Sequence, residues 1–275
     1  MPELTFGFSP CPNDTFAFHA LVHGLVDAPF SVRPVLLDIE ELNRRARTRE
    51  LDLTKLSFGA LRSVRGYEML RSGAALGHGC GPLVVAREPM TLAEASTRRL
   101  AIPGRDTTAF LLLRVFATEL GEGDLVELRY DKILQAVASG EVDAGLIVHE
   151  SRFTYRDHGL ERVVDLGELW EARTGLPVPL AAICAKDDLD EGLRRAVECA
   201  LRESVEYAFA HPEASRDYVR AHAQELSDDV CRQHIELYVN EFSVDLGAEG
   251  LAAIAALIAE PAASRATAVR RRCRR

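Results

Sequence analysis

The spacing of apolar residues changes repeatedly along the chain between the period of a strand and the period of a helix. Short alternating or continuous apolar runs, typical of strands, occur at residues 3–8, 31–37, 51–56, 74–78, 82–87, 99–102, 126–130, 142–148, 163–166 and 179–185. Apolar residues three or four positions apart, typical of one helix face, predict helices at residues 14–24, 38–47, 58–64, 109–120, 131–138 and 167–174, and throughout residues 188–258. Strands that alternate with helices predict an α/β fold with mostly parallel sheets.

The pattern restarts near residues 88 and 186, which indicates two α/β domains. We expect a large discontinuous domain made of residues 1–88 and 186–275, with a small domain of residues 89–185 inserted into it and a helical C-terminal region. In α/β sheets a ligand lies beyond the carboxyl ends of the strands. Two such domains therefore predict a binding cleft between them.

The composition argues against several classes of protein. The formal net charge is −9, and the dense basic cluster at residues 270–275 is interpreted as a frayed end of the chain. A nucleic-acid-binding protein would carry a basic face, so the charge argues against that class. The 6 cysteines are scattered without a Cys-x-x-Cys pair, so we expect reduced thiols and no metal. No secretory signal and no long apolar run are visible, which favours a cytoplasmic protein without membrane contact.

Polar and reactive side chains gather where expected strands end. The corner after the first strand, Ser9-Pro10-Cys11-Pro12-Asn13-Asp14-Thr15-Phe16, contains two prolines and two residues, Asn13 and Asp14, that can cap the following helix. Later segments carry Lys55 with Ser57, Thr107 with Thr108, and His149. Because ligands bind at the carboxyl ends of strands, we expect these four segments to meet in the cleft.

The same segments resemble a known family. The corner resembles the N-terminal signature of the 1,4-dihydroxy-6-naphthoate synthases, enzymes of the futalosine route to menaquinone. Residues 54–57, 103–109 and 140–150 resemble other landmarks of that family in the same order, and the resemblance extends over residues 1–260. It implies the type II periplasmic-binding-protein fold with an interdomain cleft. It also implies a carbon–carbon lyase that converts cyclic de-hypoxanthinyl futalosine to 1,4-dihydroxy-6-naphthoate.

The resemblance further implies roles for individual residues. His149 is the proposed general base, and the implied substrate contacts are Lys55, Leu56, Ser57, Thr107, Thr108 and Ala109. The implied reaction ends in an aromatic ring, which supplies driving force, so neither a cofactor nor a metal is needed. The implied partner is a small anionic substrate. We expect a monomer or a homodimer, with no nucleic-acid or membrane partner.

The chemistry of the residue types fits these roles. A histidine titrates near working pH, as a general base should, and Glu150 or Asp143 could orient its ring. Lys55 could neutralise a substrate carboxylate while Ser57 donates a hydrogen bond. The helix that opens near Thr108 could bind anionic or hydroxylated groups through hydroxyls and free N–H groups, or its threonines could serve only as caps.

Several residues keep more than one interpretation. We expect Cys11 to pack or to line the cleft rather than to act as a nucleophile. Asn13 and Asp14 could contact sugar hydroxyls or cap the helix, and Tyr155 is a further candidate for lining the cleft near His149. The other histidines lie mostly in helical patterns and are interpreted as structural or exposed.

Two alternative functions share the expected fold. A non-catalytic solute-binding protein would be exported and would carry a leader, which the sequence does not show. Chorismate dehydratase acts in the same pathway, and the corner at residues 9–16 argues against it.

Overall fold

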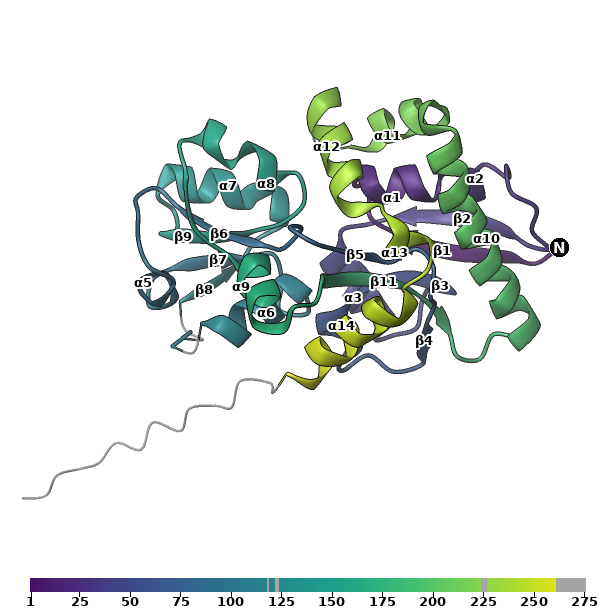
Figure 1. Ribbon diagram of the computed structural model, residues 1–275, viewed down its shortest axis with the longest axis horizontal. Coiled ribbons are helices and arrows are strands. Elements are labelled where there is room, and N and C mark those ends of the chain that lie inside the picture. Colours follow the sequence, from purple (N-terminus) through teal and green to yellow (C-terminus); the bar gives the residue numbers. More distant parts are fainter. Residues whose placement is uncertain (118, 122–123, 224–226, 261–275) are drawn as a thin grey trace, which may run out of the picture.

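The computed structural model describes residues 1–117, 119–121, 124–223 and 227–260, so the basic segment at residues 270–275 lies outside the described residues. Figure 1 shows two lobes side by side, each built on its own sheet, with the C-terminal helices gathered on one of them. The fold is α/β, as the alternating pattern predicted. No helix within the described ranges is long and apolar enough to cross a membrane.

The first sheet contains both the start of the chain and a strand from its second half. Its order is β2-β1-β3-β11-β4, and β5 also pairs with β11. The strands are β1 (Glu3–Phe8), β2 (Ser31–Leu36), β3 (Leu53–Ser57), β4 (Tyr67–Met69), β5 (Ala75–Gly77) and β11 (Val178–Lys186). Pro34 lies in β2, which is an edge strand, as expected of a residue without a backbone N–H.

The second sheet is built entirely from the middle of the chain. Its order is β10-β6-β9-β7-β8. The strands are β6 (Leu83–Ala86), β7 (Leu100–Ile102), β8 (Leu125–Glu127), β9 (Ala144–Ile147) and β10 (Glu161–Asp165).

Most helices follow the predicted apolar spacing, but the pattern did not reveal the short helix α5 or the short strand β4. The helices are α1 (Pro12–Ala17), α2 (His19–Val22), α3 (Ile39–Ala46), α4 (Phe58–Leu61), α5 (Leu92–Ser96), α6 (Thr108–Phe116), α7 (Tyr130–Ser139), α8 (Ser151–Thr154), η1 (Tyr155–His158), α9 (Leu166–Thr174), α10 (Glu191–Ala210), η2 (Pro212–Ser215), α11 (Arg216–His222), α12 (Asp228–Tyr238), α13 (Glu241–Val244) and α14 (Gly247–Ala259).

Both sheets are mixed, so the prediction of mostly parallel sheets is wrong. β1 is parallel to β2 and β3, but β11 is antiparallel to β3, β4 and β5. In the second sheet β6 is antiparallel to β9 and β10. The reason is the connection between the sheets. β11 enters the first sheet from the side at which β3 ends, with Ala181 paired to Ser57, and therefore runs against it.

Strand pairing also bears on the domain boundaries. β6 falls within expected residues 1–88 but belongs to the second sheet. β11 falls within expected residues 89–185, except for its last residue, but belongs to the first sheet. The division into two domains stays a prediction, and we propose boundaries near residues 78–82 and 175–177. One continuous hydrophobic cluster joins both sheets, since it contains Val84 of β6, Ala182 of β11 and Ile254 of α14.

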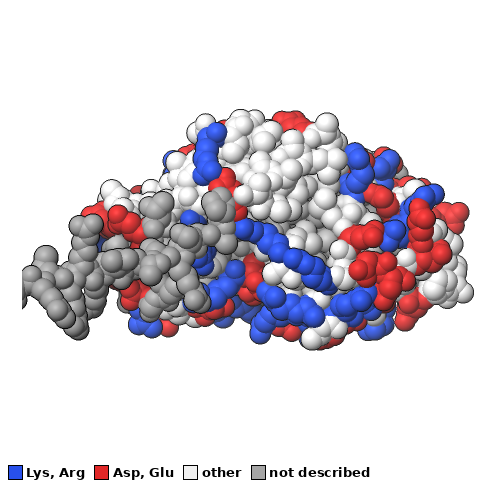
Figure 2. All heavy atoms as spheres, turned by 90° about the horizontal axis from the view of Figure 1, so that it is seen from below, with Lys and Arg blue, Asp and Glu red and all other residues white. Residues whose placement is uncertain are grey.

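The surface carries acidic and basic side chains next to each other. Arg47 pairs with Asp106 at 2.6 Å, and Arg71 pairs with Asp245 at 2.7 Å. The face in Figure 2 displays both signs of charge. Much of the positive charge of the described residues is thus locally compensated.

Candidate functional site

The corner after β1 is held by a buried carboxylate rather than by a helix cap. Pro12 is the first residue of α1, and Cys11 occupies the N-cap position without a side-chain capping bond. Asp14 Oδ2 accepts hydrogen bonds from the Ser9 backbone N–H at 3.0 Å and from the Ser9 hydroxyl at 2.7 Å. The prediction that Asn13 or Asp14 caps α1 is therefore wrong, because the Asp14 carboxylate is engaged by the residue at the end of the strand.

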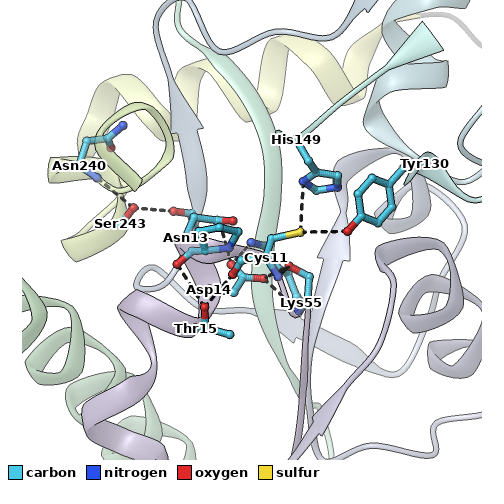
Figure 3. A network of polar contacts seen from close by, with 12 residues as sticks. Cys11, Asn13, Asp14, Thr15, Lys55, Tyr130, His149, Asn240 and Ser243 are labelled. Carbon is cyan, nitrogen blue, oxygen red and sulfur yellow. Dashed lines mark hydrogen bonds and ion pairs between the residues drawn. The ribbon is translucent and has the colours of Figure 1, made fainter. Parts of the chain in front are cut away.

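The second function of Asp14 is to pair with Lys55. The two side chains form a salt bridge, and Lys55 is 5% exposed and Asp14 1% exposed. The Asn13 amide donates to Asp14 Oδ1 at 2.8 Å, so the carboxylate receives bonds from three residues. Figure 3 shows this cluster with Cys11 and His149 beside it. The Lys55 ammonium is thus already compensated before any anionic ligand arrives.

The end of β3 presents alternate side chains to the pocket and to the core. Lys55 and Ser57 line the pocket. Leu56 points to the opposite face of the strand, where it packs fully buried against the core cluster that includes Cys184, so its side chain faces away from the pocket. Ser57 does not cap α4 through its side chain.

Ser57 is instead fixed by Asn43, which the sequence did not reveal. The Asn43 side chain accepts from the Ser57 N–H at 3.0 Å and donates to its Oγ at 3.2 Å. Asn43 lies on α3 and is completely buried. Because the Ser57 hydroxyl accepts from Asn43, its own hydrogen is available to donate into the pocket.

The start of α6 offers backbone donors. The Thr107 hydroxyl donates to the Gly104 carbonyl at 2.8 Å and accepts from the Phe110 N–H, and the Thr108 hydroxyl donates to the Leu180 carbonyl. Among the described residues, the N–H groups of Thr108 and Ala109 have no hydrogen-bond acceptor. An anion here would therefore meet N–H groups and the positive end of the helix dipole.

His149 stands two residues after the end of β9, half-buried and in an unusual backbone conformation. Its φ is 57°, the left-handed region that non-glycine residues rarely adopt. Nδ1 lies 3.6 Å from the Cys11 sulfur, and the ring packs edge-on against Tyr130 at 4.8 Å between centroids. Burial, followed by the nearby Lys55 charge, lowers the pKa of His149 to about 4. The imidazole is therefore neutral at pH 7 and able to accept a proton.

Cys11 is a poor nucleophile in this setting. Burial, with the negative charge of Glu150 adding to it, raises the pKa of the Cys11 thiol well above its ordinary value. The thiol lies 3.9 Å from the Tyr130 hydroxyl as well as next to His149. Without a low thiol pKa the reactive thiolate does not form, so the geometry fits a packing role.

Other expectations near His149 are changed by the structure. Asp143 accepts from the Arg99 backbone N–H at 3.1 Å and so serves another loop, and Tyr155 packs in a separate core cluster rather than in the pocket. Glu150 is buried next to the histidine. The ligand atoms of Cys11, His149 and Glu150 lie within 4.8 Å of one another, so these side chains could hold a metal ion.

All four predicted segments meet at one pocket between the sheets. Its empty space is about 650 Å³ with the open mouth included. Of the predicted residues, eight line it: Ser9, Asn13, Lys55, Ser57, Thr107, Thr108, Ala109 and His149. Cys11, Asp14 and Leu56 are not in the lining, although Cys11 and Asp14 contact lining residues.

Two lining residues, His234 and Tyr238, come from α12 and were missed by sequence reasoning. Their spacing of one helical turn is the spacing of any buried helix face, so it carries no separate signal of a site.

The chain is similar to proteins of menaquinone biosynthesis along almost its whole length. A family described as "Menaquinone biosynthesis" matches residues 4–262. A protein from Thermus thermophilus named "1,4-dihydroxy-6-naphtoate synthase" is 59% identical over 261 residues, with 94% of each chain covered.

Solved structures show the same architecture. A crystal structure of a protein from Archaeoglobus fulgidus has a TM-score of 0.86 at 34% identity, covering 93% of this chain and 95% of that one. The periplasmic aliphatic sulphonate binding protein of Escherichia coli has a TM-score of 0.64 at 14% identity, covering 94% and 86%. The latter likeness confirms the predicted periplasmic-binding-protein-like fold and nothing about the ligand.

Proposed function

The chain belongs to the menaquinone biosynthesis family of 1,4-dihydroxy-6-naphthoate synthases, and on that premise we propose that it converts cyclic de-hypoxanthinyl futalosine to 1,4-dihydroxy-6-naphthoate with His149 as the general base. The observation that carries the assignment of the base is the position of His149 in the wall of the pocket between the two sheets, and the lowered pKa of its imidazole is consistent with that role.

The proposed reaction requires a base held in a defined position. The reaction removes a proton, breaks a carbon–carbon bond to the sugar-derived part and ends in an aromatic ring. With a pKa of about 4 the His149 imidazole is almost entirely unprotonated at pH 7 and can accept a proton, but in the free protein it is a weaker base than the expected titration near working pH would make it. The ring contacts Cys11 through Nδ1 and packs edge-on against Tyr130, and these two contacts restrict its orientation.

The same pocket offers a matching surface for the substrate carboxylate. The free N–H groups at the start of α6 and the Ser57 hydroxyl face the same pocket as Lys55. Because Asp14 compensates Lys55, the helix N-terminus supplies the donors that the lysine alone would not. We propose that the carboxylate binds between α6 and Ser57.

The decisive experiment incubates the purified protein with cyclic de-hypoxanthinyl futalosine and follows the naphthoate by absorbance and mass. Wild-type protein is expected to form it. His149→Asn is expected to lose about 10²- to 10⁴-fold in kcat and to retain its substrate affinity in calorimetry. The exposed His158→Asn variant is the matched control and should behave as wild type.

The outcomes separate the alternatives. Naphthoate formed by His149→Asn at near the wild-type rate would remove His149 from the role of base. Substrate bound by wild type but recovered unchanged would favour a solute-binding protein. Conversion of chorismate instead would favour the dehydratase.

A further inference from the structure

His234 is a fully buried histidine whose ring nitrogens have no hydrogen-bond partner among the described residues. It is 0% exposed, and neither Nδ1 nor Nε2 makes a hydrogen bond. A buried polar group left in this state destabilises the folded protein. Such groups in native proteins call for an explanation, and a ligand that completes the bonds is one.

The position of His234 supplies that explanation. The residue lines the pocket that contains His149, and the two imidazole centroids are 6.1 Å apart. Its neighbours from other elements are Phe153 of α8, at 6.5 Å between ring centroids, and Glu150, whose Oε1 is 3.8 Å from Nδ1. On its own helix Tyr238 packs edge-on at 4.6 Å.

The surroundings determine how the ring can bind a ligand. Burial lowers the pKa of His234 well below its ordinary value, so the ring carries one proton. Nδ1 faces a carboxylate oxygen, which favours the proton on that nitrogen. The Nε2 lone pair is then left as an acceptor, and its partner must be a donor such as a hydroxyl group.

We infer that His234 is a substrate-contacting residue whose Nε2 accepts a hydrogen bond from a hydroxyl group of the sugar-derived part of the substrate. This inference rests on the proposed function. It also gives the substrate a direction in the pocket. The carboxylate end lies at α6 and Ser57, the hydroxylated end lies at α12, and His149 stands beside His234 where the proton is removed.

The test measures both stability and substrate affinity. Replacing a structural histidine should lower the stability of the protein, whereas replacing a substrate-binding histidine should lower its affinity for the substrate. In His234→Leu the unliganded protein is expected to melt at the wild-type temperature or higher, since no protein hydrogen bond is lost. Substrate affinity, measured by calorimetry in the His149→Asn background to prevent turnover, is expected to fall about 10-fold or more. The exposed His158→Leu variant controls for loss of a histidine.

A pair of amide variants tests the same contact should His234→Leu not fold. The His234→Gln side chain can place its oxygen near the Nε2 position, whereas the His234→Asn side chain is too short. Gln is therefore expected to retain most of the affinity and Asn to lose it. Equal affinity in wild type and His234→Leu, or in Gln and Asn, would overturn the inference. Failure of the wild-type protein to form naphthoate would refute the proposed function instead. The two outcomes can be told apart, because affinity is measured by calorimetry and naphthoate formation by absorbance and mass.

Discussion

The buried pair of Lys55 and Asp14 allows a quantitative test of how the site is held together. Lys55→Met removes the ammonium and leaves the Asp14 carboxylate buried without its cation. Breaking a buried ion pair from one side typically costs about 3–5 kcal/mol. Asp14 keeps the bonds from Ser9 and Asn13, so we expect the low end, about 3 kcal/mol.

This free energy corresponds to a measurable shift in melting temperature. For a chain of this size about 1 kcal/mol lowers the melting temperature by about 2–4 °C, so Lys55→Met is expected to melt about 6–12 °C below wild type. The assay is thermal unfolding of the unliganded protein followed by circular dichroism at pH 7. Lys132→Met is the control, because the Lys132 side chain is 60% exposed and should change stability by less than about 0.5 kcal/mol.

A double variant separates charge from packing. Asp14→Asn combined with Lys55→Met removes both charges and keeps an amide that can still accept from Ser9, so it is expected to recover most of the lost stability. If Lys55→Met melts within about 2 °C of wild type, or if the double variant is no more stable than the single one, the pair does not carry the electrostatic role assigned to it.

Three further outcomes follow from the geometry around His149. Because the pKa of its ring is lowered to about 4, the acid limb of kcat/KM is expected near that pH, and a limb near the ordinary 6.5 would contradict it. Dialysis against a chelator should leave turnover unchanged, and activity lost on chelation would show a required metal. Added Zn²⁺ should inhibit the enzyme by binding Cys11, His149 and Glu150. His149→Gly should melt about 2–4 °C above His149→Ala, since only glycine adopts φ 57° without strain, and the reverse order would refute this.

The sequence predicted the parts of the site that depend on local pattern. Strand ends can be located from the period of apolar residues, and ligands gather beyond them, so the convergence of Lys55, Thr108 and His149 could be expected. The alternation along β3 also places Lys55 and Ser57 on one face and the Leu56 side chain on the other.

Contacts between distant segments could not be read in the same way. The direction of β11 depends on where the chain re-enters the first sheet, which no local pattern records. The bond between Asn43 and Ser57 joins α3 to the end of β3, and an asparagine on a helix gives no sign of such a partner. His234 reaches the pocket from a helix whose apolar spacing is that of an ordinary packed face.

The placement of His149 near a compensated ion pair has a consequence for catalysis. In the unliganded protein Lys55 lowers the pKa of His149 while Asp14 raises it, and burial outweighs both. A bound anionic substrate adds negative charge to the same pocket, and a nearby negative charge favours the protonated imidazole. Binding should therefore raise the pKa of His149 toward the working pH, where a base is most effective. Because kcat reports the bound state and kcat/KM the free one, the acid limb of kcat should lie at higher pH than that of kcat/KM. Coincident limbs would mean that the substrate charge does not reach the base.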